Sequence, residues 1–151
     1  MEQLYPGDFD KVCSLLEEND LLVTDLDPAD LKQFLGHREG SSIVAVGGIQ
    51  AFGEEGLLRS IAIARSRRES GFGKAIVIKL EQRAAAYGIR ALYLLTETAP
   101  EFFVKLGYEV VRRSEVPNTI RATAQFSELC PASAICMSRK LPPNVKLERT
   151  C

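Results

Sequence analysis

Residues 57–88 decide the fold, and they read LLRSIAIARSRRESGFGKAIVIKLEQRAAAYG. The apolar run from Leu57 to Ile63 predicts a strand, and the polar, glycine-bearing stretch after it predicts a loop. Apolar residues then recur at helical spacing up to Gly88, where the helix is expected to end. The residues expected on the buried face of this helix are Ile76, Leu80, Ala84 and Tyr87. The segment therefore predicts a strand, a loop and a helix in direct succession.

The loop between this strand and helix has the chemistry of an anion site. The first amides of a helix lack intrahelical acceptors, and the glycines Gly71 and Gly73 leave room for a phosphate to approach them. Phosphate groups bind at helix starts of this kind. Basic side chains add positive charge around the loop: Arg65, Arg67, Arg68 and Lys74. The alternative for such a loop is a tight turn with a purely structural role.

Two common phosphate-binding motifs do not fit the loop. A P-loop requires Ser or Thr after Gly73-Lys74, and Ala75 stands there. A dinucleotide fingerprint requires a third glycine at position 76, which is Ile76. Neither motif therefore explains the two glycines.

The flanking sequence predicts the remaining elements of an α/β protein. The apolar stripe of Phe9, Val12, Cys13 and Leu16 predicts a first helix. A second helix is expected to begin at Asp27-Pro28 and to bury Leu31, Phe34 and Leu35. Two further helices are expected, from Pro100 to Leu106 and over 117–128. Strands are expected at 43–48, 91–95, 108–111 and 134–141, with a hairpin turn at 53–56. The run 91–95 is apolar throughout, which indicates a central strand. His37 falls in a polar run that predicts a surface loop.

The composition bounds the class of protein. A chain of 151 residues with 46 % apolar residues is expected to form one domain, residues 1–141, followed by a frayed tail at 142–151. The net charge of −1 offers no basic field for nucleic acid or anionic lipid, and no apolar run is long enough to span a membrane. The start of the chain lacks signal-peptide features, so we expect a cytoplasmic protein. Four cysteines without a CxxC pair and one histidine favour free thiols over disulfides or a metal site.

Residues 68–73, Arg-Glu-Ser-Gly-Phe-Gly, stand between an apolar strand and an amphipathic helix. In this setting they resemble the Arg/Gln-x-x-Gly-x-Gly/Ala motif of the GCN5-related N-acetyltransferase (GNAT) superfamily. The resemblance covers nearly the whole chain and implies a mixed, mostly antiparallel sheet with a V-shaped splay, flanked by helices. A narrower likeness is to arsenic-resistance-associated N-acetyltransferases and the acetyltransferase domain of N-acetylglutamate synthase. It rests on residues 56–60, 120–123 and 129–134.

The resemblance implies that acetyl-CoA binds between the strands at 57–63 and 91–95, with no metal. Two splayed parallel strands expose backbone groups that pantetheine amides can complete like an added strand. The amides of residues 69–74 would hold the pyrophosphate, and an amide of the strand would polarise the thioester carbonyl. The residues assigned to the cofactor are Ile61, Ile63, Arg67, Arg68, Glu69, Ser70, Gly71, Phe72, Gly73, Lys74 and Phe103.

The chain departs from the family pattern at four positions. Glu69 and Ser70 replace a small and a basic residue beside the expected pyrophosphate. A carboxylate there weakens binding unless it points away or pairs with a neighbouring arginine. Phe103 stands where many relatives have a tyrosine that protonates the thiolate, and Leu57 stands where many have a glutamate.

Other residues are therefore expected to move the protons. A base must deprotonate the attacking ammonium, and carboxylates near the two central strands are candidates: Glu54, Glu55 and Glu97. Two tyrosines are candidates to protonate the thiolate, Tyr108 and Tyr93. The alternative for each carboxylate is a solvated loop side chain, and for each tyrosine it is core packing.

Arg59 is the candidate anchor for an acceptor carboxylate. An arginine within an apolar strand indicates a cleft or an ion pair, and the alternative is a side chain that faces solvent. Arg121 and Ser133 are second candidates, supported by the narrower resemblance.

The resemblance implies direct acetyl transfer to the primary amine of a small amino-acid-like substrate, in a ternary complex without a covalent enzyme intermediate. One alternative is a non-catalytic sensor or interaction module that binds CoA. Another is acetylation of protein lysines or N-termini. A homodimer is left open.

Overall fold

The structure is a computed structural model that describes residues 1–129 and 132–143. Its strands are β1 (Glu2–Gln3), β2 (Phe34–Glu39), β3 (Ser42–Phe52), β4 (Glu55–Ile63), β5 (Ala91–Thr96), β6 (Glu109–Val110) and β7 (Ile135–Lys140). Its α-helices are α1 (Phe9–Glu18), α2 (Phe72–Ala86), α3 (Pro100–Lys105) and α4 (Asn118–Arg121). Short 3₁₀ helices lie at Pro6–Asp8, Pro28–Gln33, Arg65–Arg67 and Arg113–Glu115, and a π-helix lies at Gln125–Leu129.

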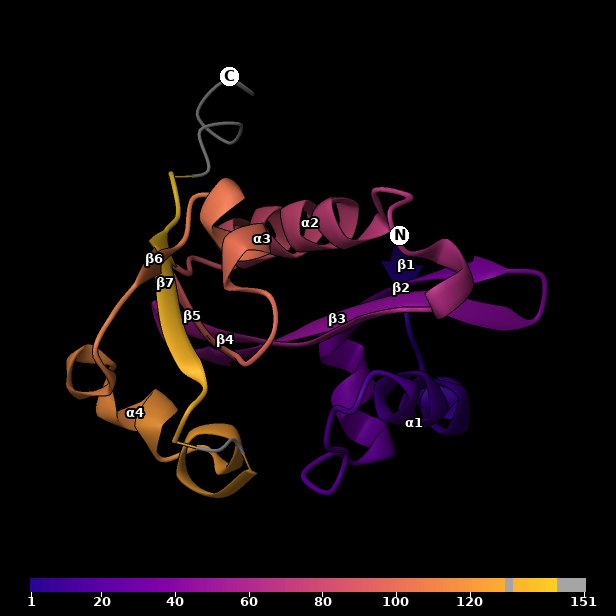
Figure 1. The fold of residues 1–151 in the computed structure, drawn as a ribbon, viewed down its shortest axis with the longest axis horizontal. Helices are drawn as coiled ribbons and strands as arrows, with labels where there is room; N and C mark the ends of the chain where they lie inside the picture. Colours follow the sequence, from indigo (N-terminus) through magenta and orange to yellow (C-terminus); the bar gives the residue numbers. More distant parts are fainter. Residues whose placement is uncertain (130–131, 144–151) are drawn as a thin grey trace. The chain divides into compact units, whose positions relative to one another are not determined.

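The strands form one sheet in the order β1-β2-β3-β4-β5-β7-β6 (Figure 1). β1 pairs with β2, β2 with β3, and β5 and β6 with β7, all antiparallel, whereas β4 and β5 form a parallel ladder. This mixed, mostly antiparallel sheet with flanking helices confirms the expected fold class. β5 has a neighbour on each side, as its apolar sequence predicts. The succession of β4, loop and α2 is also confirmed.

The chain divides into two compact units. They comprise Met1–Gln50 with Leu58–Leu80, and Ala51–Leu57 with Glu81–Cys151. The expectation of one domain over 1–141 stays a prediction. The expected tail at 142–151 lies outside the described residues from position 144 onward, as do Cys130 and Cys151.

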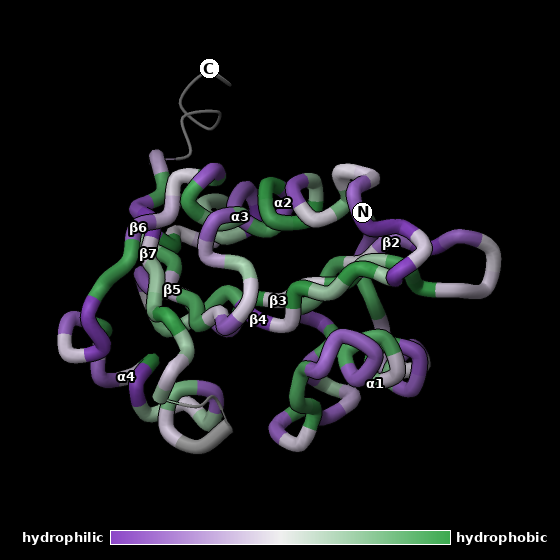
Figure 2. The backbone as a smooth tube through the Cα atoms, in the orientation of Figure 1, coloured by the Kyte–Doolittle hydropathy of each residue, from purple (hydrophilic) through white to green (hydrophobic). Residues whose placement is uncertain are grey.

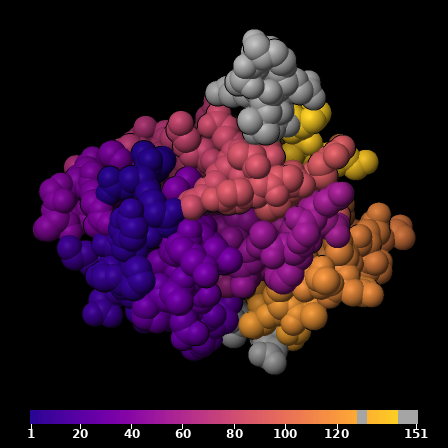
Figure 3. Space-filling view, turned by 180° about the vertical axis from the view of Figure 1, so that it is seen from behind, coloured from indigo at the N-terminus to yellow at the C-terminus, as the bar shows by residue number. Residues whose placement is uncertain are grey.

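In the first unit, helices cover both faces of β3, which is drawn mostly in the hydrophobic colour (Figure 2). Val12 and Leu16 of α1 pack on one face with Val46 of β3. On the other face, a Cβ built on Gly47 would lie 2.9 Å from the side chain of Leu80 in α2. The glycine therefore allows α2 to approach the sheet closely. The space-filling view shows the indigo N-terminal residues against violet residues of the same unit (Figure 3).

In the second unit, β5 and β7 pair along the whole length of both strands, from Ala91 opposite Lys140 to Thr96 opposite Ile135. An apolar cluster forms beside this ladder, and its buried members are Leu57, Val116, Ile120, Phe126 and Cys136. Because Leu57 also belongs to β4, the cluster holds the start of β4 within this unit.

The helix expected from Asp27-Pro28 is wrong beyond Gln33. Pro28–Gln33 forms a 3₁₀ helix, and Phe34 begins β2, where it lies opposite Gly48 of β3. A Cβ on Gly48 would lie 2.7 Å from the Phe34 ring, so the ring packs over the glycine. Pairing with β3 thus overrides the helical spacing of the apolar residues. The expected loop around His37 is also wrong, because His37 belongs to β2.

Two further helix expectations need correction. Tyr87 is 68 % exposed, because α2 ends at Ala86 and the ring turns out toward Arg83, whose guanidinium lies 5.9 Å from the ring centroid. The helix expected over 117–128 is broken into α4 and a π-helix. There the Thr123 hydroxyl donates to the Ile120 carbonyl at 2.6 Å, a side-chain bond that competes with the helical ladder.

Candidate functional site

The loop between β4 and α2 has the backbone geometry of an anion site. Gly71 has φ +86° and Glu69 has φ +67°, in the left-handed region that side chains rarely adopt. α2 begins at Phe72, and the Ala75 amide donates to the Gly71 carbonyl at 3.0 Å as the helical ladder starts. The amides of residues 72–74 precede this bond and therefore lack an acceptor within the helix.

Helix starts of this kind bind phosphate groups. A Cβ built on Gly71 would meet no atom within 4 Å, so the approach to the amides is open. The N-terminal end of α2 carries the positive end of the helix dipole, and Lys74 is exposed in the first turn. The space beside Gly71 and the positive end of α2 thus suit an anionic group.

The arginines before this loop are tied to neighbouring elements of the first unit. The Arg67 Nε donates to Glu39 Oε1 of β2 at 2.6 Å, and the Arg68 Nη2 donates to Asn19 Oδ1 after α1 at 2.8 Å. Among the described residues, neither arginine pairs with Glu69, whose side chain is exposed. The Ser70 hydroxyl donates to the Arg67 carbonyl and stabilises the turn.

Two amides expected to bind the thioester end of the cofactor lie on the edge of β4 that faces away from β3. The Ala64 amide donates to the Val44 carbonyl of β3 at 2.8 Å. Because successive amides of a strand point to opposite sides, the Ile63 and Ile61 amides point to the other edge. The parallel ladder with β5 ends at Leu57, six residues before the end of β4.

Arg59 is buried in an ion pair. Its side chain is 1 % exposed, and its Nη1 and Nη2 donate to the two oxygens of Asp25 at 2.5 and 2.9 Å. Its Nε donates to the Ser60 hydroxyl at 3.0 Å, and Nη1 also reaches the Gln50 side-chain oxygen at 3.4 Å. The ion pair expected for an arginine within an apolar strand is thus present, and the solvent-facing alternative is wrong. Sequence reasoning missed Asp25, because nothing distinguishes it from other loop carboxylates.

Tyr108 is buried in a polar network of the second unit. Its hydroxyl donates to Glu81 Oε2 at 2.8 Å, and the Arg139 Nη1 donates to Glu81 Oε1 at 2.7 Å. Burial, followed by the Glu81 charge, raises the pKa of Tyr108 far above its usual value. This favours the core-packing alternative, while the role of Tyr108 as an acid stays a prediction. Glu81 was missed, although its place one turn after the buried Val77 is a signal.

Phe103 is 7 % exposed and packs edge-on against the Tyr108 ring, with centroids 5.6 Å apart. A phenyl ring offers no proton, so Phe103 can contribute only packing to the cofactor site. Its assignment to the cofactor stays a prediction.

The three candidate carboxylates do not lie together. Glu55 begins β4 opposite Ala91, whereas Glu97 follows the far end of β5, about 20 Å further along the strand. Glu54 is exposed in the hairpin turn, and Glu97 is also exposed. Glu55 contacts the Tyr93 hydroxyl, and burial, followed by the Glu55 charge, raises the pKa of Tyr93. The structure therefore brings together one base candidate and one acid candidate.

Arg121 and Ser133 are exposed. Arg121 ends α4 and donates to Asn118 within the same helix, and Ser133 lies in the turn before β7. Their role in acceptor binding stays a prediction.

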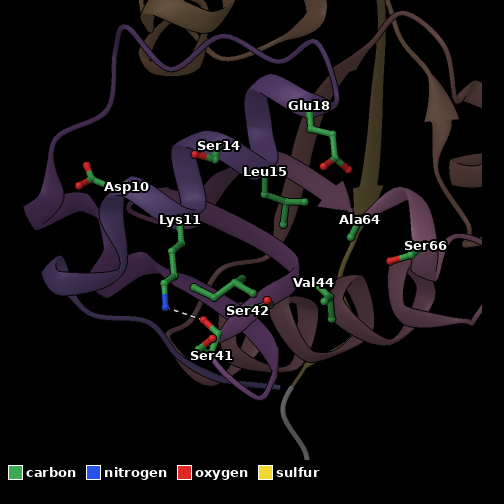
Figure 4. A pocket seen from close by; sticks show the side chains of 11 residues that line it. Asp10, Lys11, Ser14, Leu15, Glu18, Ser41, Ser42, Val44, Ala64 and Ser66 are labelled. Carbon is green, nitrogen blue, oxygen red and sulfur yellow. Dashed lines mark hydrogen bonds between the residues drawn. The ribbon is translucent and has the colours of Figure 1, made fainter.

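A polar groove of about 510 Å³ lies elsewhere in the first unit, between α1 and the β2–β3 turn (Figure 4). Lys11 spans it and donates to the Ser41 carbonyl at 2.5 Å. Its lining residues are Asp10, Lys11, Ser14, Leu15, Glu18, Ser41, Ser42, Ile43, Val44, Ala64 and Ser66. None of the sequence-predicted site residues is among them.

Within residues 1–129 and 132–143, no cluster of His, Cys, Asp and Glu could hold a metal ion. No helix in this part of the chain is both long and apolar enough to cross a membrane. Cys13 and Cys136 are free thiols, as expected, and burial raises the pKa of Cys136 to about 11.

Solved structures of acetyltransferases share this fold. N-acetylglutamate synthase from Neisseria gonorrhoeae, complexed with coenzyme A and N-acetyl-glutamate, aligns over 93 % of this chain at 19 % identity and a TM-score of 0.81. Only 34 % of that enzyme is covered, so the chain spans about a third of its length. Rv2747 from Mycobacterium tuberculosis, in complex with CoA and NLQ, aligns over 93 % of this chain and 98 % of its own, at 18 % identity and a TM-score of 0.78.

A more distant match is the Escherichia coli ribosomal-protein-S18-alanine N-acetyltransferase, with 16 % identity, 93 % and 92 % coverage and a TM-score of 0.65. At these identities the likeness establishes the fold. The sequence model of the Acetyltransferase (GNAT) family matches residues 1–108. The chain therefore belongs to the GNAT family, whose members are N-acetyltransferases that use acetyl-CoA, and the expected class and cofactor are confirmed.

Proposed function

We propose that the protein transfers the acetyl group of acetyl-CoA to the primary amine of a small amino-acid-like acceptor. The observation that carries the proposal is the loop at residues 69–74, where two left-handed residues precede the unpaired amides of α2. The pyrophosphate binds these amides, and Lys74 adds charge. The ligands of two fold neighbours, N-acetyl-glutamate in one and NLQ in the other, support an amino-acid acceptor.

The reaction is a direct attack within a ternary complex. The amine nitrogen attacks the thioester carbon, the carbon–sulfur bond breaks, and the thiolate takes up a proton. The amides of Ile61 and Ile63 point away from β3, and one of them stabilises the developing oxyanion. Glu54, Glu55 and Glu97 remain the candidates for the base, and the raised pKa of Tyr93 keeps its phenol protonated and able to donate.

The test is a thiol-release assay with acetyl-CoA over amino acids, their amides and short peptides. The proposal expects release with at least one free amino acid. Release with peptides alone would favour acetylation of proteins, and micromolar CoA binding without any release would favour the non-catalytic module. Single substitutions to glutamine at Glu54, Glu55 and Glu97 identify the base, because the loss of the base should lower kcat and leave the Kd for CoA unchanged.

A further inference from the structure

The guanidinium of Arg59 already holds a carboxylate. Asp25 binds it at two points, in the geometry that a ligand carboxylate would adopt. The Asp25 side chain is 13 % exposed and that of Arg59 is 1 % exposed. Asp25 therefore stands between the buried cation and solvent.

Two of the other N–H groups of Arg59 also have acceptors within the protein. Nε donates to the Ser60 hydroxyl, and Nη1 reaches Gln50 of β3. A second carboxylate can therefore bind at the same two points only after Asp25 has moved away. An acceptor that depends on Arg59 must compete with Asp25.

The pair lies close to the reacting end of the proposed cofactor site. Ser60 follows Arg59 with φ +59°, a left-handed conformation that interrupts the regular strand. The next amide is that of Ile61, on the edge of β4 that faces away from β3. Asp25 belongs to the loop between α1 and the 3₁₀ helix Pro28–Gln33, so a ligand that displaces it also breaks an ion pair between this loop and β4.

We propose that Asp25 is a specificity-determining residue, which competes with the acceptor's carboxylate for Arg59. The inference rests on the proposed function and adds the preference of its acceptor site. With Asp25 in place, the site binds a free amino acid no more tightly than the same molecule with its carboxylate converted to an amide. Without the charge of Asp25, the buried cation selects the acid.

A purely structural ion pair makes a different prediction. If Asp25 only fastens its loop to β4, its removal weakens the binding of an acid and of the matching amide by the same factor. The ratio of the two affinities therefore separates the two roles, whatever the change in overall stability.

The test measures the binding of N-acetyl-L-glutamine and N-acetyl-L-glutaminamide to the CoA-loaded protein by titration calorimetry. Neither ligand has an ionisable amine, so they differ in charge only at the carboxylate. The wild type should bind both within about threefold, and Asp25→Asn should prefer the acid by about tenfold or more. Asp20→Asn, an exposed aspartate in the same loop, should behave as the wild type.

A wild type that prefers the acid by about tenfold or more would overturn the proposal. This result needs no variant, so it decides the matter even if Asp25→Asn does not fold. If folded Asp25→Asn has the same ratio of affinities for the acid and the amide as the wild type, the proposal is also overturned. It is likewise overturned if neither ligand binds to the wild type or to Asp25→Asn. The proposed function fails on a different result, the absence of thiol release with any free amino acid.

Discussion

The substitution Glu69→Gly tests the loop most informatively, because the structure gives it two separable effects. Glu69 has φ +67° and an exposed carboxylate beside the proposed pyrophosphate site. A side chain in the left-handed region costs roughly 1–2 kcal/mol, and the greater freedom of glycine in the unfolded chain offsets about 0.4–1 kcal/mol of that. The variant should therefore be more stable by up to about 1.6 kcal/mol.

The second effect is electrostatic. Two unit charges about 8 Å apart in water interact by about 0.5 kcal/mol, and a pyrophosphate carries two charges. Removal of the Glu69 carboxylate should thus tighten CoA binding about two- to fivefold at low salt, and less at high salt.

Glu69→Gln separates the two effects, because it removes the charge and keeps the Cβ. Both variants should bind CoA more tightly in calorimetric titrations at two salt concentrations. Glu69→Gly alone should raise the Tm of the ligand-free protein. The reasoning is refuted if both variants bind CoA as the wild type does, or more weakly.

Three further predictions test other parts of the structure. Gly71→Ala, at φ +86° in open space, should weaken CoA binding about tenfold. Its control, Gly53→Ala at φ +68° in the hairpin turn, should cost similar stability and leave the Kd for CoA unchanged. Equal changes of this Kd in the two variants would contradict the role of the loop in CoA binding. Tyr108→Phe should lower the free energy of unfolding by about 1–3 kcal/mol, because Glu81 loses a buried hydrogen-bond donor. The same variant should keep kcat within about twofold of the wild type. A fall in kcat of about 100-fold in a folded variant would instead make Tyr108 the acid. The hydrogen bond from Arg38 lowers the pKa of Asp8. The Asp8 carboxylate therefore stabilises the fold above its unfolded pKa of about 3.9, and this contribution is lost as the pH falls through the folded pKa. Between about pH 5 and pH 3 the wild type should lose more stability than Asp8→Asn in denaturant titrations, and equal losses would contradict this.

Much of the fold follows from local patterns. β4, the glycine loop and α2 follow from an apolar run, two glycines and helical spacing, all within about 30 residues of chain. The region before residue 40 was harder to predict, because Phe34 has the spacing of a helical residue and yet packs over Gly48 on the neighbouring strand. A contact with a residue so distant in sequence is not visible in local periodicity.

The candidate site divides in the same way. The anion loop depends on adjacent residues, so the sequence predicts it. The pairing of Arg59 with Asp25 and of Tyr108 with Glu81 joins residues 34 and 27 positions apart. An unusual arginine within a strand predicts some partner, but only the folded chain shows that the partner is a carboxylate of the protein itself.

The central claim is that the backbone amides beside Gly71 and Gly73 hold the pyrophosphate of CoA, and a crystal structure of the complex tests it most directly. The account predicts pyrophosphate oxygens within about 3 Å of the amide nitrogens of residues 71–74, with the left-handed φ of Glu69 and Gly71 retained. A pyrophosphate bound away from the start of α2, with these amides facing solvent, would contradict it.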